Sequence, residues 1–306
     1  MVVIANSGRY EETLAIEVPA HKRVELRADN HCRPSVVLTA ELTLTGGEAA
    51  EIVLDGLLVS GAAVRVPAAA GNELARLRLR HCTLVPGLAL EEDATPQQPT
   101  QASVRVEIAD LALTIERSII GALRIHPGAT MSATDSIVDA TAVDRMGYAD
   151  LDDVGAGGAL RLVCCTVIGK VHALSFPLVS NSVLLTRLAS ADTLPAPVIA
   201  ERRQEGCVRF SYLPRGARVP RRFHCWPESA SSPAAAVPRF TSLRYGFPAY
   251  MQLATTSGAE LLTGADNEGQ PGAFNFLFQP QRESNLRVRL DEYLRTGLEA
   301  GILFAS

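Results

Sequence analysis

Residues 116–140 read ERSIIGALRIHPGATMSATDSIVDA, a stretch that contains one short phrase twice. In each copy a serine, Ser118 or Ser136, comes just before two branched apolar residues, and the two copies start 18 positions apart. Short β-branched runs that end at Gly, Asp or Pro are typical of strands. A repeat of this length matches one bare coil of a parallel β-helix, in which each coil stacks on the previous one. The stretch therefore predicts stacked coils of short parallel strands.

The same phrase recurs over the first two thirds of the chain. Its aligned positions are spaced by 26, 36, 18, 29, 17 and 25 residues, and they are Gly56, Cys82, Ser118, Ser136, Cys165, Ser182 and Cys207. The longer spacings predict a coil with an inserted loop, and segments 91–101 and 144–158 have the composition of loops. The alignment also predicts equivalent interior positions in successive coils, namely Ile119, Ile137, Val167 and Val183.

An antiparallel β-sandwich is the alternative fold for a chain with many short strands. That fold predicts hairpin turns of the Asn-Gly or Asp-Gly type, and Asp55-Gly56 is the only clear one. No segment before residue 212 has the pattern of a ten-residue amphipathic helix. We therefore expect a mainly β protein with a single-stranded parallel β-helix over residues 1–212.

The composition limits the classes of function. Hydrophobic residues make up 47% of the 306 residues and the formal net charge is only −4, so the chain can bury a large core and has no overall field for nucleic acid. No apolar run reaches the roughly 18 residues of a membrane helix, and residues 1–12 lack the pattern of a secretory signal. We expect a cytoplasmic protein with reduced thiols that can be incorporated into a particle.

The aromatic residues divide the chain into two parts. Thirteen of the 16 aromatic residues follow position 200, which indicates two modules with different cores. Segment 213–239 contains five prolines and is predicted to be an extended connector. Residues 240–306 then form a small C-terminal docking module.

One helix is predicted in this module, within residues 281–301. Its apolar positions fall on one helical face, and they are Leu286, Leu290, Tyr293, Leu294 and Leu298. The spacing also predicts ion pairs of Asp291 with Arg287 and Arg295, and Gly297 is a stop signal. The apolar stripe is expected to pack on AFNFLF at 273–278 or to contact another subunit.

Segment 201–244 is strongly basic, with nine Arg and three Glu. Two interpretations remain open: a solvated flank that covers the end of the solenoid, or an Arg-rich docking surface for an acidic partner. No nucleic-acid motif accompanies the arginines. The candidate docking surface combines these arginines with the C-terminal apolar residues, and its members are Arg215, Arg218, Arg221, Arg222, Trp226, Tyr245, Tyr250, Phe276, Leu290 and Tyr293.

Carboxylates are the first candidates for chemistry. Asp150, Asp152 and Asp153 share one loop and form an alternative carbohydrate site, because glycoside hydrolysis needs two carboxylates about 5–9 Å apart. The same residues are ordinary turn formers. The pairs His31-Cys32, His81-Cys82 and His224-Cys225 lack the spacing of a zinc site, and neighbours on a strand point to opposite faces. We expect core thiols, no catalytic residues, no metal and no cofactor.

Several longer phrases resemble a bacterial family of right-handed parallel β-helix repeat proteins that occur beside phage-tail-like or contractile-injection gene clusters. The phrases are LRLRHCTLVPG, IERSIIGALRI, ATDSIVDAT, CCTVIGKVHA, ERRQEGCVRFSYLPRGARVPRRFHCWP, FTSLRYGFPAY and FQPQRESNLRVRLDEYLRTGLEAGI. The resemblance covers nearly the whole chain and is most specific over 199–306. It implies the right-handed fold and a particle context, and it carries no catalytic residue.

These observations predict a non-enzymatic structural or adaptor protein of a phage-tail-like assembly. Its partners are expected to be other proteins of that assembly or a second copy of the chain, without nucleic acid or a membrane span. The alternative is a carbohydrate-binding or polysaccharide-cleaving β-helix.

Overall fold

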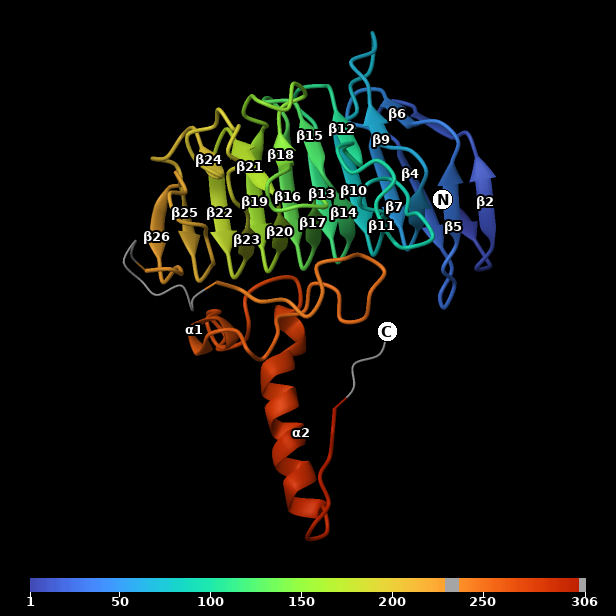
Figure 1. Ribbon diagram of the computed structural model, residues 1–306. Coiled ribbons are helices and arrows are strands. Elements are labelled where there is room, and N and C mark those ends of the chain that lie inside the picture. Colours follow the sequence, from blue (N-terminus) through green and yellow to red (C-terminus); the bar gives the residue numbers. More distant parts are fainter. Residues whose placement is uncertain (229–236, 303–306) are drawn as a thin grey trace.

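The computed structural model describes residues 1–228 and 237–302 and is dominated by short parallel strands (Figure 1). Within these residues, the strands form three sheets of ten, eight and eight strands. From β1 to β25, consecutive strands enter the three sheets in turn, so that each strand pairs with the one three places away along the chain, and β25 also pairs with β26. The prediction of stacked coils is confirmed, and the antiparallel sandwich is excluded for this part of the chain.

The first sheet, sheet A, contains β1 (Val2–Ile4), β4 (Arg23–Ala28), β7 (Glu51–Asp55), β10 (Arg76–Arg80), β13 (Ala112–Glu116), β16 (Thr130–Thr134), β19 (Ala159–Val163), β22 (Phe176–Ser180), β25 (Gly206–Arg209) and β26 (Arg221–Phe223). Sheet B contains β2 (Arg9–Glu12), β5 (Ser35–Leu38), β8 (Leu58–Ser60), β11 (Thr83–Leu84), β14 (Ile119–Gly121), β17 (Ile137–Asp139), β20 (Thr166–Ile168) and β23 (Val183–Leu185). Sheet C contains β3 (Ala15–Val18), β6 (Leu42–Gly46), β9 (Val64–Val66), β12 (Val104–Val106), β15 (Leu123–Ile125), β18 (Met146–Ala149), β21 (Lys170–Ala173) and β24 (Val198–Ala200).

The interior of the solenoid is a stack of aliphatic side chains contributed by all three sheets. In sheet B, the inward-facing residues of successive coils are paired in register, and they are Ile120, Val138, Val167 and Leu184. The aromatic residues Tyr148 and Phe176 are also fully buried in this core. Each coil therefore depends mainly on the two coils beside it, as in other repeat proteins.

One predicted interior row is wrong for three of its four members. Ile119, Ile137 and Val183 are in register with Thr166, and Ile137 and Val183 belong to two smaller clusters outside the solenoid core. Only Val167 points inward. Strands β14, β17 and β23 of sheet B begin with two apolar residues that face opposite sides, so their composition does not show which face is the interior.

The aligned phrase marks the corner between sheets A and B. From β7 onward, the corner residue after each strand of sheet A has a positive φ, and the residues concerned are Gly56, His81, Arg117, Asp135, Cys164, Asn181, Phe210 and His224. The next residue points inward, so that Cys82, Ser118, Ser136, Cys165 and Ser182 are equivalent, as predicted. The other two members are shifted, because Leu57 rather than Gly56 comes just before β8, and Cys207 lies in β25 of sheet A.

Serine hydroxyls connect these corners. The backbone N–H of Cys82 donates to the Ser118 hydroxyl at 3.0 Å, and the Ser118 hydroxyl donates to the carbonyl of Glu116 at 2.8 Å. The N–H of Ser118 donates to Ser136 in the same way. These bonds satisfy buried backbone groups that the corner leaves outside the strand ladder. His81-Cys82 and His224-Cys225 are thus corner pairs, in which the histidine takes the left-handed conformation and the buried cysteine follows.

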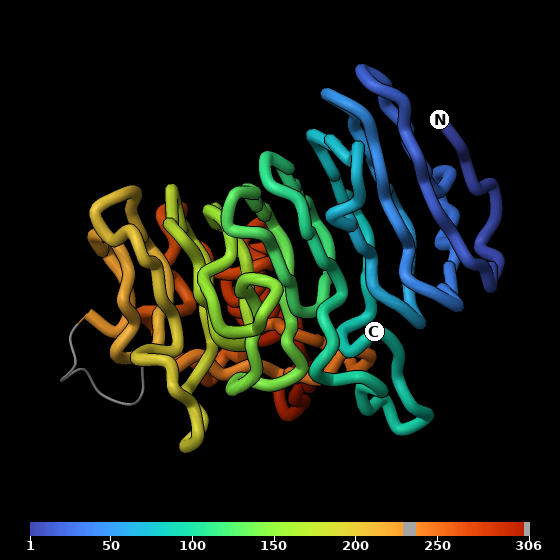
Figure 2. The backbone as a smooth tube through the Cα atoms, turned by 90° about the horizontal axis from the view of Figure 1, so that it is seen from above, coloured from blue at the N-terminus to red at the C-terminus, as the bar shows by residue number. Residues whose placement is uncertain are grey.

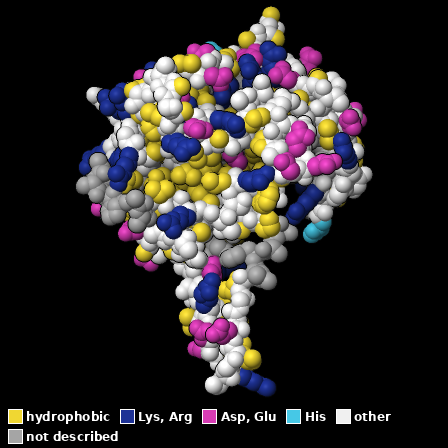
Figure 3. All heavy atoms as spheres, in the orientation of Figure 1, with side chains coloured by type: hydrophobic (Ala, Val, Ile, Leu, Met, Phe, Trp, Pro, Cys, Tyr) yellow, Lys and Arg dark blue, Asp and Glu magenta, His cyan; other side chains and the backbone are white. Residues whose placement is uncertain are grey.

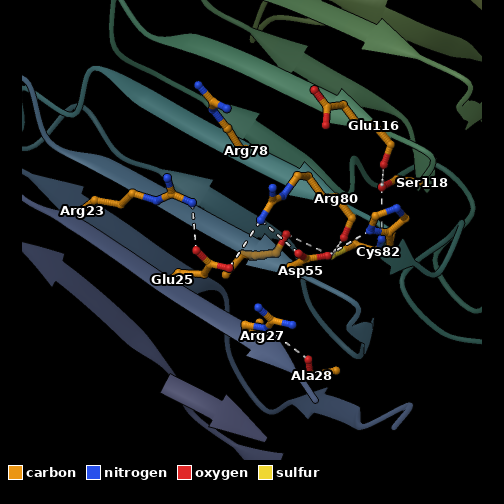
Figure 4. A network of polar contacts seen from close by, with 12 residues as sticks. Arg23, Glu25, Arg27, Ala28, Asp55, Arg78, Arg80, Cys82, Glu116 and Ser118 are labelled. Atoms are coloured by element: carbon orange, nitrogen blue, oxygen red, sulfur yellow. Dashed lines mark hydrogen bonds and ion pairs between the residues drawn. The ribbon is translucent and has the colours of Figure 1, made fainter. Parts of the chain in front are cut away.

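The outer face of sheet A carries a ladder of charged side chains over β4, β7 and β10 (Figure 4). Arg80 lies 3.0 Å from Asp55 and 3.4 Å from Glu25, which also pairs with Arg23 at 2.8 Å. Alternating charges between neighbouring coils keep this face soluble and favour the observed stacking register. The end of the sheet is also charged, because β26 is exposed and carries Arg221 and Arg222.

The C-terminal part, residues 237–302, lies against one side of the solenoid (Figures 1 and 2). It contains α1 (Ala259–Leu262), the 3-10 turn η2 (Asn275–Leu277) and α2 (Gln279–Tyr293). Strand β26 falls within the segment predicted as the connector, and so sheet A continues beyond residue 212. Among residues 1–228 and 237–302, no helix has the length and apolar character needed to cross a membrane.

Candidate functional site

The candidate site is the C-terminal segment, which covers the outer face of sheet B over β14, β17, β20 and β23. Ile137 and Ile168 of the solenoid form a buried cluster with Met251 and Ala273. A second cluster joins Val183 to Leu261 of α1. Burial of the outward apolar residues explains why the strands of sheet B are apolar on both faces. The solenoid and the C-terminal segment therefore share a core.

Polar contacts fix the segment in one position. The Asn181 side-chain amide donates to the Asp266 carboxylate at 2.7 Å, and the Asp266 N–H donates back to the Asn181 side-chain oxygen at 3.0 Å. The Ala273 N–H donates to the Thr166 hydroxyl at 3.0 Å. The Arg244 guanidinium donates to the Asp93 carbonyl at 2.9 Å, in the loop after β11. The contacts are spread over several coils, so the segment is fastened along the solenoid.

Tyr250, a predicted docking residue, is part of this attachment. Its hydroxyl donates to the buried carboxylate of Asp139 at 2.6 Å. Burial raises the pKa of Asp139, although the hydrogen bonds from Tyr250 and the N–H of Thr141 oppose the shift. Burial likewise raises the pKa of Tyr250 well above its usual value. Tyr245 packs edge-on against the Tyr250 ring, with the ring centroids 5.6 Å apart. Both tyrosines are half-buried and anchor the segment.

Trp226 has a similar structural role. It is half-buried and packs against the cluster formed by Val183, Tyr212 and Leu261. A Cβ atom at Gly264 would lie 3.0 Å from the Trp226 ring and 2.2 Å from the Glu260 carbonyl oxygen, so the close approach requires glycine. Trp226 therefore joins the last coil to the segment around α1.

The four arginines of the candidate surface lie on the last coil of the solenoid. All four are exposed, and they are Arg215, Arg218, Arg221 and Arg222. Arg218 extends sheet C through a bridge to Ile199, and Arg221 lies on the edge strand β26. Charged residues on an edge strand prevent further strands from pairing with it. Their position fits the flank that covers the end of the solenoid.

Helix α2 points away from the solenoid instead of packing on it (Figure 1). It begins after Phe278, which has a positive φ, and contains a proline in its first turn. Of the described α2 residues, Glu283 alone is buried, while Leu286 is 48% and Tyr293 is 78% exposed. The prediction that this stripe packs on residues 273–278 is therefore wrong. Figure 3 shows apolar side chains among the charged ones along the projecting helix.

The ion pairs of α2 also differ from the predicted ones. Arg287 pairs with Glu283 at 2.7 Å, and Arg289 pairs with Glu292 at 3.4 Å. The predicted partner of Arg287, Asp291, lies on the C-terminal side. A carboxylate N-terminal to the cation at i,i+4 is the better orientation, because it agrees with the helix dipole.

The alternative carbohydrate residues lie in the loop after β18. The Asp150 carboxylate accepts the N–H of Leu151 at 2.7 Å, and the Asp152 carboxylate accepts the N–H of Gly155 at 2.7 Å. These contacts are typical of turn-forming aspartates. Asp153 differs, since its carboxylate pairs with the buried guanidinium of Arg124. Asp150 and Asp152 therefore stabilise the turns of the loop, and Asp153 forms an ion pair with Arg124.

Sequence reasoning missed Thr166, Asn181 and Asp139, which hold the C-terminal segment. A signal for two of them was present in the strands of sheet B. Thr166 and Asp139 are polar residues at outward positions that are otherwise apolar, as at Ile137 and Val183. A polar residue on a covered apolar face needs a partner from the covering segment.

No protein-family model, curated protein or solved structure matches this chain.

Proposed function

We propose that this chain is a non-enzymatic structural adaptor, in which the solenoid is the rigid body and α2 binds a partner protein. The observation that carries the proposal is the exposure of the apolar stripe of α2, where Leu286 and Tyr293 are 48% and 78% in solvent. A 15-residue helix has marginal stability by itself in water. Burying its apolar stripe in a partner supplies the missing packing.

The charges beside the stripe favour a different, acidic partner over a second copy of the chain. Leu286, Leu290 and Tyr293 have the spacing of the contact positions of a coiled coil, and Arg282 and Arg287 then occupy the flanking positions. In a parallel pair of identical helices, Arg282 of one would face Arg287 of the other. Like charges at these positions oppose pairing. Carboxylates at the rim of a partner's groove would instead complement them.

The attachment of the C-terminal segment supports an adaptor function. A binding helix can only transmit position or load if its base is fixed, and Thr166, Asn181 and Asp139 fix the segment that precedes α2. We also propose the right-handed sense for the solenoid, because connections between parallel strands of one sheet are overwhelmingly right-handed. The proposal that the partner belongs to a phage-tail-like assembly rests on the resemblance of the sequence.

The test compares two sets of substitutions on α2. We expect the triple variant with Leu286→Ser, Leu290→Ser and Tyr293→Ser to lose the partners that co-purify with the wild-type chain from native extract. Val288→Ser is the matched control, because Val288 is 56% exposed and lies outside the stripe. Circular dichroism would show an intact β signal in both variants. Retention of every partner by the triple variant would rule out α2 as the binding element.

Carbohydrate cleavage is the alternative, and it predicts a different result. An activity on acidic polysaccharide that Asp152→Asn or Asp153→Asn abolished would replace the adaptor proposal. The α2 substitutions would leave such an activity unchanged, so the two experiments distinguish the functions.

A further inference from the structure

A second feature lies at the corner between sheets B and C, where the chain leaves each strand of sheet B. The corners here differ greatly in length. Ala122 alone separates β14 from β15, and Gly169 alone separates β20 from β21. The coils that alternate with these two carry longer loops at the same corner, over residues 85–103, 140–145 and 186–197. Short corners between longer loops leave a hollow above the edge of sheet C.

This hollow is a cavity of about 290 Å³. Its walls come from each of the three loops and from the loop after β18, and its floor includes Ala122. The volume is at the lower end of the range for sites that hold small molecules. Loops carried on a rigid scaffold are a common location for such sites.

The cavity is lined by three cationic side chains, Arg124, Arg145 and Lys170. The side chains of Arg124 and Lys170 are only 5% and 9% exposed. Lys170 is one of two lysines in a chain with 29 basic residues, so this chain rarely uses a compact ammonium group. Burying cations is costly unless their donors are satisfied.

Carboxylates neutralise only part of this charge. Asp192 pairs with Lys170 at 2.5 Å, and Asp153 pairs with Arg124. Arg145 donates to the Thr141 hydroxyl, and among the described residues it forms no ion pair with a carboxylate, although its charge acts on the buried Asp139. The lining therefore holds three cations and two carboxylates. Arg124 already donates to the carbonyls of Leu123 and Met146, so the donors for a ligand come mainly from Arg145, whose guanidinium has five N–H groups.

We propose that this cavity binds a small oxyanion, a carboxylate or phosphate carried on a molecule no larger than a monosaccharide. Arg145 is the main ligand, since its guanidinium can present two parallel N–H donors to the oxyanion. Lys170 and Arg124 line the same space, and with their carboxylate partners they leave the lining with one net positive charge, that of Arg145. Asp153 is 63% exposed and covers Arg124 at the mouth of the cavity. The site is independent of α2, which projects from the segment on the outer face of sheet B.

The experiment is isothermal titration calorimetry of the full chain with inorganic phosphate, D-galacturonate and, as the uncharged control, D-galactose. We expect one site per chain for at least one of the two anions and none for galactose. Binding of phosphate alone or of galacturonate alone supports the proposal and identifies which oxyanion the cavity accepts. If neither anion binds at millimolar concentration, the proposal is wrong.

Arg145→Gln should weaken the binding at least tenfold, which is the effect of losing a hydrogen bond to a charged group. This variant removes the favourable charge of Arg145 near the buried Asp139, but that carboxylate keeps its hydrogen bonds from Tyr250 and Thr141, and so the variant should fold. Lys170→Met tests the second cation, although it removes the partner of Asp192. Arg161→Gln is the matched control, because Arg161 is exposed on sheet A, and its binding should stay within twofold of wild type. Unchanged affinity in Arg145→Gln would overturn the assignment.

Discussion

Ile137 tests whether the C-terminal segment is held by the outer face of sheet B. The side chain is 2% exposed and contacts Met251 and Ala273, whereas its neighbour Val138 is equally buried but faces the solenoid core. Replacing Ile137 by Ala removes three buried carbon atoms, which costs about 2.4 kcal/mol at about 0.8 kcal/mol for each. Only the contact between the segment and sheet B should weaken by this amount.

The assay is hydrogen exchange followed by mass spectrometry. A loss of about 2.4 kcal/mol accelerates exchange through local opening about 50-fold, since each 1.4 kcal/mol corresponds to about a factor of ten. We expect this acceleration in residues 237–278, with the strands of sheet A unchanged. Val138→Ala is the control, and it should accelerate exchange in the coil that contains β17. If Ile137→Ala instead loosened the solenoid and left 237–278 protected, Ile137 would face the interior and the assignment of the faces would be incorrect.

Three further measurements test other parts of the structure. Burial raises the pKa of Cys82 to about 11 and that of Cys165 to about 12. Iodoacetamide at pH 8 should therefore label the more exposed Cys32 first, and Cys82 and Cys165 only on unfolding. Early labelling of Cys165 would contradict its inward position. Burial also raises the pKa of Asp139 above its unfolded value of about 3.9. Its protonated form therefore favours the folded state, and this contribution is complete below the unfolded pKa and lost as the pH rises through the folded pKa. In the Asp139→Asn variant this loss of stability with rising pH should disappear. A pH profile of the melting temperature like that of the wild type would contradict the role of Asp139. Gly272 has a φ of +107°, and a Cβ atom there would lie 2.8 Å from the Thr166 hydroxyl oxygen. Gly272→Ala should therefore lower the free energy of unfolding, measured by urea denaturation, by at least about 1 kcal/mol. An unchanged midpoint would show that the loop can shift.

The coils could be predicted because their corners repeat a chemical requirement. Each corner needs a left-handed residue followed by a small inward side chain, and the pairs Arg117-Ser118 and Asp135-Ser136 show this in the sequence. The face of each strand could not be predicted in the same way. Counting from Cys165 places Thr166 level with Ile119, whereas apolar character favours its neighbour Val167, which lies on the other face. The alternation of side chains along a strand shows which residues share a face of the sheet. It does not show which of the two faces is the interior.

The candidate site was predicted only in part, because it depends on contacts distant in the sequence. The helical spacing of Leu286 and Leu290 is visible, but nothing in that spacing shows that the helix leaves the solenoid. The cations of the cavity are likewise scattered, at Arg124, Arg145 and Lys170, and coil stacking brings them together. The sequence contains the inserted loops that form the walls. It does not show which corner of the coil carries them.

The attachment of the C-terminal segment has a mechanical consequence. A force applied to α2 enters the solenoid through Tyr250, Asp266 and Ala273, whose contacts lie on the coils of β17, β20 and β23. The load is therefore shared among several coils, with Trp226 as a further contact on the last one. It is not concentrated on the terminal strands, where peeling needs to break only one strand ladder at a time. A pull on the helix must shear several side-chain anchors together. The chain is built to resist tension across its coils more strongly than tension that unwinds it from an end.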